Sequence, residues 1–213
     1  MSPEDEPLQL YGRPLGPLQA NCYILARESR CEALVIDPGA DDPWLEETLK
    51  GYTLTHIVLT HAHYDHIGGL NSLRANTGAP VLIHEAEQEW LADPALNLSV
   101  MGGEASAVVC DGPDQLLAAG DEISFAGHSL RVLHTPGHSP GGITLLVADI
   151  CLSGDTLFYR SIGRTDLPGG DHGRLLRVMR RELLVLPDEV QVFPGHGPMT
   201  TIGDERKFNP FIN

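Results

Sequence analysis

Positive charge is scarce in this sequence. Its 14 lysines and arginines are outnumbered by 29 aspartates and glutamates, which gives a formal net charge of −15 at pH 7. Because proteins hold a nucleic-acid backbone with lysine and arginine side chains that neutralise phosphates, we expect no nucleic-acid partner. A small anionic substrate is not excluded, since bound divalent cations would reverse the sign of the charge at a cleft.

Cysteine pairs and long apolar runs are also missing. The four cysteines are Cys22, Cys31, Cys110 and Cys151. They form no Cys-x-x-Cys pair, so they are interpreted as buried or incidental thiols rather than as a disulfide framework or a nucleophile. No apolar run is long enough to span a membrane. The acidic segment 1–7 lacks the basic and apolar parts of a secretory signal. We therefore expect a frayed N-terminal tail on a soluble, cytoplasmic protein without a membrane partner.

Linkers, repeats and low-complexity tracts are absent as well, which predicts one α/β domain over residues 1–213. The length and the 42% of hydrophobic residues suffice for one substantial core. Apolar patterning predicts strands at 22–26, 33–36, 57–59, 81–84, 123–125, 130–134, 143–147, 150–152 and 190–193. It predicts helices near 42–50, 68–76, 85–91, 173–184 and 203–208. The strands at 22–26 and 33–36 are expected to pair, and those from 123 to 152 to form a second sheet. The buried stripe of helix 173–184 is expected to be Leu175, Leu176, Met179 and Leu183.

One short segment carries most of the chemistry. Directly after the apolar run 57–59 comes the sequence Thr60-His61-Ala62-His63-Tyr64-Asp65-His66. Alternation at the end of a strand points the imidazoles of His61 and His63 the same way. Asp65 and His66 follow where the chain must turn into a helix, so they can face a second point nearby. Imidazole nitrogens with carboxylate oxygens are the ligands of zinc and related metals, so the segment predicts a metal site.

Three further candidate ligands lie in glycine-rich or proline-rich turns. His138 follows Pro136-Gly137, Asp155 follows Gly154, and His196 follows Pro194-Gly195. Each turn comes after a short β-type run, and a rigid strand end can aim a side chain into a cleft. Such a turn residue is often merely structural, but several of them in one chain favour a shared metal site.

Together these motifs resemble those of the metallo-β-lactamase superfamily, and within it the short, single-domain glyoxalase II-like hydrolases. The resemblance runs from about Gly16 onward. It rests on the His-x-His-x-Asp-His motif at 61–66, on His138, Asp155 and His196, and on the segments 36–39, 163–166, 200–203 and 209–211. It implies a four-layered αββα sandwich with metals at one edge between the sheets.

The resemblance also implies how the ligands divide. His61, His63 and His138 would hold one divalent ion, Asp65, His66 and His196 a second, and Asp155 would bridge both. Ligands without thiolate suit zinc, iron or manganese, and zinc is preferred. Two such ions share a water whose pKa falls toward about 7, and the resulting bridging hydroxide would attack a carbonyl carbon.

Two aspartates have additional expected roles. Besides Asp155, Asp65 is a candidate catalytic residue that orients the hydroxide or carries its proton. Asp37 is a candidate acceptor for the N–H of a ligand imidazole, which would fix the tautomer of that ring. The alternative for Asp37 is an ordinary turn aspartate.

A thioester is the expected substrate, because its leaving group, a thiolate whose conjugate thiol has a pKa of about 8.5, departs without strong acid assistance. The family resemblance suggests a hydroxyacylglutathione such as S-D-lactoylglutathione. Arg164 stands where that family carries a basic residue for the glutathione moiety, and the alternative role is a loop ion pair with Asp166 or Asp171. Only 17 residues follow His196, so we expect no separate C-terminal glutathione-binding domain.

Other functions stay open. A glutathione persulfide dioxygenase of the same superfamily carries similar motifs but uses a single iron held by two histidines and one aspartate. A lactonase or another ester hydrolase fits the same ligands. A β-lactamase is less favoured, because the commonest zinc β-lactamases have cysteine where Asp155 stands. A non-catalytic metal-binding domain would be expected to have an incomplete ligand set, and this set is complete. The sequence predicts nothing about the oligomeric state.

Overall fold

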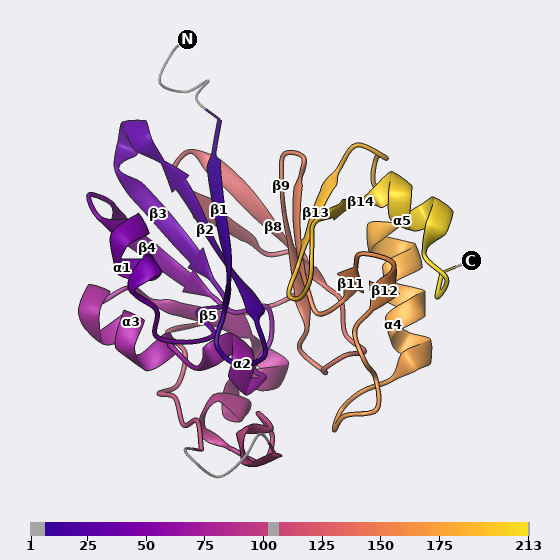
Figure 1. Cartoon of the computed structure of the whole chain (residues 1–213), viewed down its shortest axis with the longest axis horizontal. Coiled ribbons are helices and arrows are strands. Elements are labelled where there is room, and N and C mark those ends of the chain that lie inside the picture. The colour runs from indigo at the N-terminus through magenta and orange to yellow at the C-terminus, as the bar shows by residue number, and fades with distance from the viewer. Residues whose placement is uncertain (1–6, 102–106, 213) are drawn as a thin grey trace.

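The computed structural model describes residues 7–101 and 107–212, and Figure 1 shows two sheets packed face to face with helices on the outside. The expected frayed tail at 1–7 lies outside the described residues except for Pro7, which is exposed. Indigo and magenta segments form one half of the molecule, and orange and yellow segments form most of the other (Figure 1). The chain thus builds one sheet after the other.

The first sheet has six strands in sequence order. They are β1 (Gln9–Leu15), β2 (Ala20–Arg27), β3 (Glu32–Ile36), β4 (Thr53–Val58), β5 (Val81–His84) and β6 (Gln115–Leu117). The strands β1, β2 and β3 pair antiparallel, as predicted for 22–26 and 33–36, whereas β3, β4, β5 and β6 pair parallel. The parallel strands therefore end at one common edge.

The second sheet also has six strands, in the order β14-β13-β10-β9-β8-β7. They are β7 (Glu122–Phe125), β8 (His128–His134), β9 (Ile143–Val147), β10 (Ile150–Gly154), β13 (Gln191–Pro194) and β14 (Thr200–Thr201). A separate two-stranded hairpin consists of β11 (Leu157–Phe158) and β12 (Ser161–Ile162). Since β10 and β13 pair parallel, they too end at one edge.

Helices cover the outer faces of both sheets. They are α1 (Pro43–Leu49) and α3 (Leu70–Thr77) on the first sheet and α4 (His172–Val178) and α5 (Ile202–Phe208) on the second, while the short α2 (Tyr64–Ile67) lies at the edge of the sheets. Three short 3₁₀ segments, η2 (Glu28–Arg30), η3 (Glu85–Ala92) and η4 (Ser99–Met101), and a π-helical segment, η5 (Met179–Leu183), complete the described secondary structure. The start of α1 follows its sequence signals, because the side chain of Asp42 accepts a hydrogen bond from the backbone N–H of Trp44 and Pro43 occupies the first turn.

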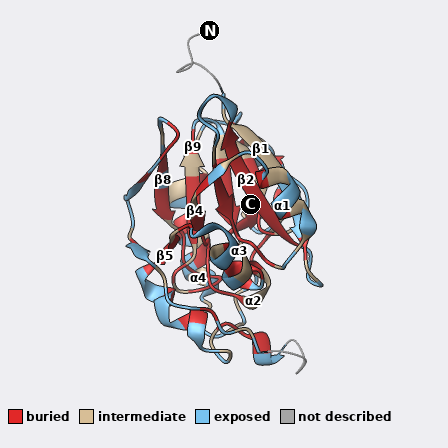
Figure 2. Cartoon of the chain, turned by 90° about the vertical axis from the view of Figure 1, so that its left-hand side faces the viewer, coloured by how far each residue is buried: buried red, intermediate tan, exposed pale blue. Residues whose placement is uncertain are grey.

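Three apolar clusters separate four layers. One lies between the first sheet and the helices α1 and α3, one between the two sheets, and one between the second sheet and the helices α4 and α5. Figure 2 shows β2 in red, and all eight of its residues are buried. The predicted αββα sandwich is therefore confirmed. Leu175, Met179 and Leu183 are buried as predicted, and Leu176 is partly buried against the same cluster.

Several elements differ from the prediction. The helix at 85–91 is the 3₁₀ segment η3, and the helix at 173–184 changes from α to π geometry after Val178. Short strands such as β6, β11, β12 and β14 were not predicted, because two or three residues carry no readable periodicity. The cysteines are free, and Cys31 is the exposed one.

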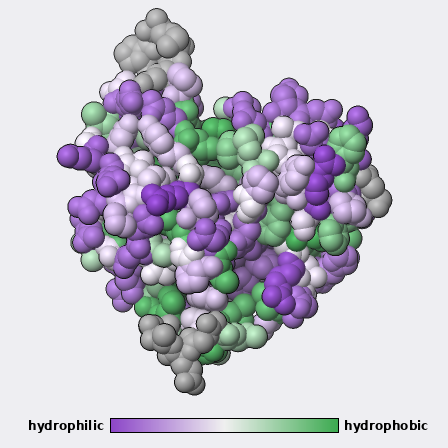
Figure 3. All heavy atoms as spheres, viewed as in Figure 1, coloured by the Kyte–Doolittle hydropathy of each residue, from purple (hydrophilic) through white to green (hydrophobic). Residues whose placement is uncertain are grey.

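The outer surface is largely hydrophilic. In the view of Figure 3, purple hydrophilic side chains dominate and green patches are small and separate. In the part of the chain that the structure describes, no helix combines the length and apolarity that a membrane crossing requires.

Candidate metal centre

All seven candidate ligands lie at one edge of the two sheets. His61 and His63 occupy the loop between β4 and α2, and Asp65 and His66 lie on α2 itself. The other three ligands follow strands of the second sheet, with His138 after β8, Asp155 directly after β10 and His196 after β13. The site is thus assembled across the seam between the sheets. The structure brings together every residue that the sequence pointed to.

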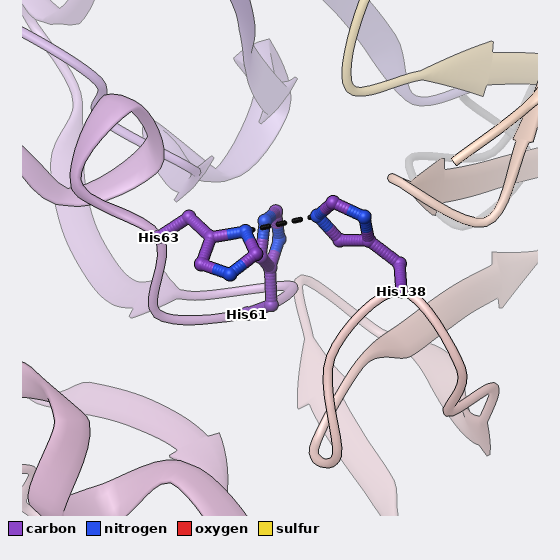
Figure 4. A group of neighbouring side chains, drawn as sticks. All are labelled: His61, His63 and His138. Carbon is purple, nitrogen blue, oxygen red and sulfur yellow. Dashed lines mark hydrogen bonds between the residues drawn. The ribbon is translucent and has the colours of Figure 1, made fainter. Parts of the chain in front are cut away.

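Three histidines form the first ligand group. One ring nitrogen each of His61, His63 and His138 lies within 4.8 Å of the others. Figure 4 shows His63 and His138 pointing at each other from opposite loops, with Nδ1 of His63 2.9 Å from Nε2 of His138. All three rings are buried. The two halves of the fold therefore meet at a cluster of nitrogen donors.

The second ligand group contains Asp65, His66 and His196, again with ligand atoms within 4.8 Å of one another. Oδ2 of Asp65 lies 3.2 Å from Nε2 of His196 and 3.7 Å from Nε2 of His66. Asp155 lies between the two groups. Its Oδ2 is 3.4 Å from Nε2 of His138 and 3.6 Å from Nε2 of His196, and its Oδ1 is 3.5 Å from Nε2 of His66.

The arrangement fits bound metal ions. The atoms His61 Nε2, His66 Nε2 and Asp155 Oδ1 are buried and have no hydrogen-bond partner among the described residues. Leaving a buried polar atom unpaired costs about 1–3 kcal/mol, so three in one place indicate that something else satisfies them. Histidine nitrogens and carboxylate oxygens are suitable donors for first-row divalent metals. The two groups are consistent with a dinuclear centre, and the identity of the metal stays a prediction.

Asp37 and Thr60 orient two of the ligand rings. Asp37 is buried at the end of β3, and its Oδ2 lies 2.9 Å from Nδ1 of His66. The hydroxyl of Thr60 donates to Oδ2 of Asp37 at 2.5 Å and lies 3.1 Å from Nδ1 of His61. The backbone N–H of Thr60 donates to Oδ1 of Asp37 at 2.7 Å. Protons on both Nδ1 atoms satisfy this network, which leaves the Nε2 lone pairs of His61 and His66 free for a metal.

The pKa values differ sharply between the two groups. Burial lowers the pKa of His61 well below its ordinary value and that of His63 to about 3. Burial also opposes protonation of His66, but the carboxylates of Asp65, Asp155 and Asp37 outweigh it and raise the pKa of this ring to about 10. In the metal-free protein at neutral pH, His61 and His63 are therefore neutral, whereas His66 is cationic and must release its Nε2 proton when a metal binds.

Glycines give the ligands room to approach. A Cβ at position 195 would lie 2.1 Å from Oδ1 of Asp155 and 2.9 Å from Cε1 of His66. A Cβ at position 163 would lie 1.8 Å from the backbone oxygen of Asp155. Both contacts are far shorter than any side chain tolerates, so Gly195 and Gly163 are required by the packing around Asp155.

A cavity of about 540 Å³ opens above the ligands. Besides five of them, its lining consists of Leu18, Tyr64, Leu98, Met101, Phe158, Ser161, Ile162, Arg164 and Leu167. Arg164 contributes in two ways. Its backbone oxygen lies 2.8 Å from Nδ1 of His138, and its guanidinium forms two hydrogen bonds to Asp166 at 2.8 and 2.7 Å. Both side chains of this ion pair are exposed.

Two functional residues were missed by the sequence analysis. Thr60 directly precedes the His-x-His-x-Asp-His motif, but the sequence predicted no role for its hydroxyl. Glu87 lies in η3, is fully buried, and accepts hydrogen bonds from the backbone of both loops that carry the three histidines. It is one of three glutamates, Glu85, Glu87 and Glu89, in a segment predicted to be a helix, and glutamates in such a segment are usually exposed. The sequence held no signal that set it apart.

Comparison with known proteins agrees with this geometry. Residues 15–196 match the family model described as the metallo-beta-lactamase superfamily. The chain is 43% identical over 206 residues to the "Probable metallo-hydrolase YqgX" of Bacillus subtilis, with 94% of this chain and 95% of that protein covered. It is 31% identical over 205 residues to the "Hydroxyacylglutathione hydrolase GloC" of Haemophilus influenzae, with 94% and 96% covered.

Solved structures agree as well. BLEG-1, described as a B3 metallo-beta-lactamase, superposes with a TM-score of 0.91 at 42% identity, covering 96% of this chain and 99% of that one. TTHA1623 in a di-iron-bound form superposes with a TM-score of 0.79 at 36% identity, covering 94% and 99%. With its seven ligands at the seam of two sheets and these likenesses over nearly its whole length, the chain belongs to the metallo-β-lactamase superfamily and is a probable metal-dependent hydrolase.

Proposed function

We propose that the protein hydrolyses thioesters, with a hydroxyacylglutathione such as S-D-lactoylglutathione as its substrate. The main support is the lining of the cavity. Besides the metal ligands, the ionisable side chains among its described residues are those of Tyr64 and Arg164, and both are weak acids with ordinary pKa values of about 10 or above, so no strong proton donor stands beside the site. A thiolate, whose conjugate thiol has a pKa of about 8.5, leaves without such a proton donor. The likeness to the hydroxyacylglutathione hydrolase GloC supports the same substrate class.

The residues of this chain have distinct roles around the reacting carbonyl. His61, His63 and His138 would hold one ion, and Asp65, His66 and His196 the other. Such ions polarise a carbonyl oxygen and lower the pKa of water. Asp155 faces both groups and so fixes the spacing between the ligands.

Asp37 and Thr60 hold the rings of His66 and His61 in the tautomer that presents Nε2 to the site. Apolar side chains, among them Leu98, Phe158 and Leu167, line the walls of the cavity in which the thioester would lie.

Metal content tests the number of ions. Protein purified without chelator and reconstituted with zinc should approach two ions per chain, because one ion would leave either ligand group empty. A persistent single ion would contradict the dinuclear assignment and favour a mononuclear iron dioxygenase, which oxygen consumption with glutathione persulfide would detect.

Arg164 tests the glutathione assignment. If its guanidinium binds a glutathione carboxylate in ground state and transition state alike, Arg164→Ala should mainly raise KM and leave kcat nearly unchanged. Loss of a charge-assisted contact is worth about 1.5–3 kcal/mol, roughly ten- to a hundredfold in kcat/KM. A simple acyl-thiol without carboxylates should lose much less.

Asp166 supplies the matched variant, because it occupies the guanidinium in the free protein. If Arg164 serves the substrate, Asp166→Asn should free the guanidinium and lower KM for the glutathione thioester. If the ion pair only orders the loop, both variants should harm both substrates alike. That result would remove the main reason for naming glutathione.

β-Lactam hydrolysis is the second candidate, favoured by the similarity to BLEG-1. A panel of glutathione thioesters, simple acyl-thiols, lactones and β-lactams, assayed with protein of measured metal content, separates the two. Higher kcat/KM for β-lactams than for every thioester would reject the thioesterase proposal.

A further inference from the structure

A buried carboxylate links the two loops that carry the three-histidine group. Glu87 lies in η3, which starts directly after β5, and none of its surface is exposed. Its Oε2 accepts a hydrogen bond from the backbone N–H of Ala62 at 2.6 Å. Its Oε1 accepts one from the backbone N–H of Gly141, also at 2.6 Å. The first of these donors belongs to the β4–α2 loop and the second to the loop after β8.

The positions of the two donors relate the link to the metal ligands. Ala62 lies between His61 and His63, and Gly141 lies three residues after His138. The first loop belongs to one sheet and the second to the other. Each oxygen of Glu87 therefore holds one side of the three-histidine group, and the bridge spans the seam across which His63 faces His138 (Figure 4).

The chemistry of the bridge requires a carboxylate. Two N–H donors need two acceptor oxygens, and a glutamine offers one oxygen and would turn its NH₂ group toward the other donor. A Cβ at position 141 would lie 2.9 Å from Cγ of Glu87, so Gly141 is what allows the close approach. Burying a charged group is costly unless it is hydrogen-bonded, and a packing role alone would be served by an apolar residue.

The second ligand group has different support. Its ring His66 is held by Asp37, and the hydrogen bonds of Glu87 go to Ala62 and Gly141 rather than to Asp65, His66 or His196. Removing the carboxylate of Glu87 should therefore affect one group and spare the other.

We propose that Glu87 is a positioning residue that sets the spacing of the three-histidine metal site by holding its two loops together across the sheets. Trp90, on the same segment, packs behind the site with its ring centroid 6.0 Å from that of His63. The inference rests on the metal centre and not on the identity of the substrate, so it stands or falls separately from thioester hydrolysis.

The test measures zinc affinity at each group separately. The His196→Ala background leaves the three-histidine group complete, and the His138→Ala background leaves the other group complete. Zinc is titrated into each metal-free variant against a chromophoric chelator. In the His196→Ala background, Glu87→Gln should weaken zinc binding about ten- to a hundredfold, the usual effect of losing a partner that orients ligands. In the His138→Ala background the affinity should stay unchanged.

Glu205→Gln is the matched control. Glu205 is also fully buried and bridges separate segments, accepting from Thr200 at 2.6 Å and from the backbone N–H of Arg160 at 2.9 Å, but it contacts neither histidine loop. Glu205→Gln should lower the Tm of the metal-free protein and leave zinc affinity at the three-histidine group intact.

Three outcomes overturn the proposal: no loss of affinity in the His196→Ala background, an equal loss in both backgrounds, or the same loss from Glu205→Gln. If Glu87→Gln does not fold, Glu87→Asp replaces it. The shorter side chain keeps the charge but cannot reach both N–H groups, and the same site-selective loss is expected.

Discussion

Replacing Asp37 by asparagine should switch the tautomer of a metal-ligating ring. Oδ1 can still accept from the backbone N–H of Thr60, but the new NH₂ group would face Nδ1 of His66, which lies 2.9 Å from Oδ2 in the native protein. Two donors cannot face each other, so His66 would lose its Nδ1 proton and keep the one on Nε2. That atom is the one that faces Asp65 and Asp155. The lone pair needed for a metal is then occupied.

The size of the effect follows from the bond that is lost. A hydrogen bond to a charged group contributes about 1.5–3 kcal/mol. Since about 1.4 kcal/mol corresponds to a factor of ten, zinc affinity at the group of Asp65, His66 and His196 should fall roughly ten- to a hundredfold. The three-histidine group should lose less, because the hydroxyl of Thr60 can reorient and still accept from His61.

Competition with a chromophoric chelator measures both affinities, and kcat/KM on a thioester follows in parallel. Asp42→Asn is a suitable control, because Asp42 caps α1 and its side chain contacts Trp44 and Arg13 rather than a ligand. Native zinc affinity in Asp37→Asn, or an equal loss in Asp42→Asn, would refute the tautomer argument.

Three further changes probe the same centre. Asp155→Ala should abolish hydrolysis with circular dichroism unchanged, because its carboxylate faces both groups; near-native turnover with two ions bound would contradict this. Gly195→Ala should weaken zinc binding through a Cβ 2.1 Å from Oδ1 of Asp155, whereas Gly112→Ala, with open space around it, should not. The pKa of His66 is raised to about 10 and that of His196 is also raised, so zinc must displace protons there. Affinity at that group should rise with pH between about 6.5 and about 10, and calorimetry in buffers of different ionisation enthalpy should detect the released protons. By the same shift, the metal-free fold should lose stability as pH rises toward that upper value.

The metal ligands could be predicted from the sequence because they lie in recognisable turns that directly follow strands. Six residues hold four of the seven, and the other three follow short apolar runs. Parallel neighbours such as β10 and β13 end at one edge, so residues 41 positions apart in the chain, Asp155 and His196, meet there. The order of the layers, unlike the metal ligands, could be predicted only from the family resemblance.

Contacts made through space were not accessible. Glu87 looks like its exposed neighbour Glu85, and only the folded chain shows that it reaches two loops. The edge strand β1 was missed because Gly12 and Pro14 read as turn residues. Proline is tolerated there because an edge strand leaves some of its N–H groups unpaired.

Because the metal site lies at the seam between the sheets, the stability of the fold should depend on the concentration of free metal. Each ligand group draws on both halves of the molecule, so an ion bound there acts as a clasp between them. A ligand that binds only the folded state stabilises it by about 2.7 kcal/mol when its free concentration is about a hundred times Kd. Two clasps would approach the whole stability of a typical domain, which is about 5–15 kcal/mol. Removal of the metal would thus weaken the contact between the two halves and abolish catalysis at the same time.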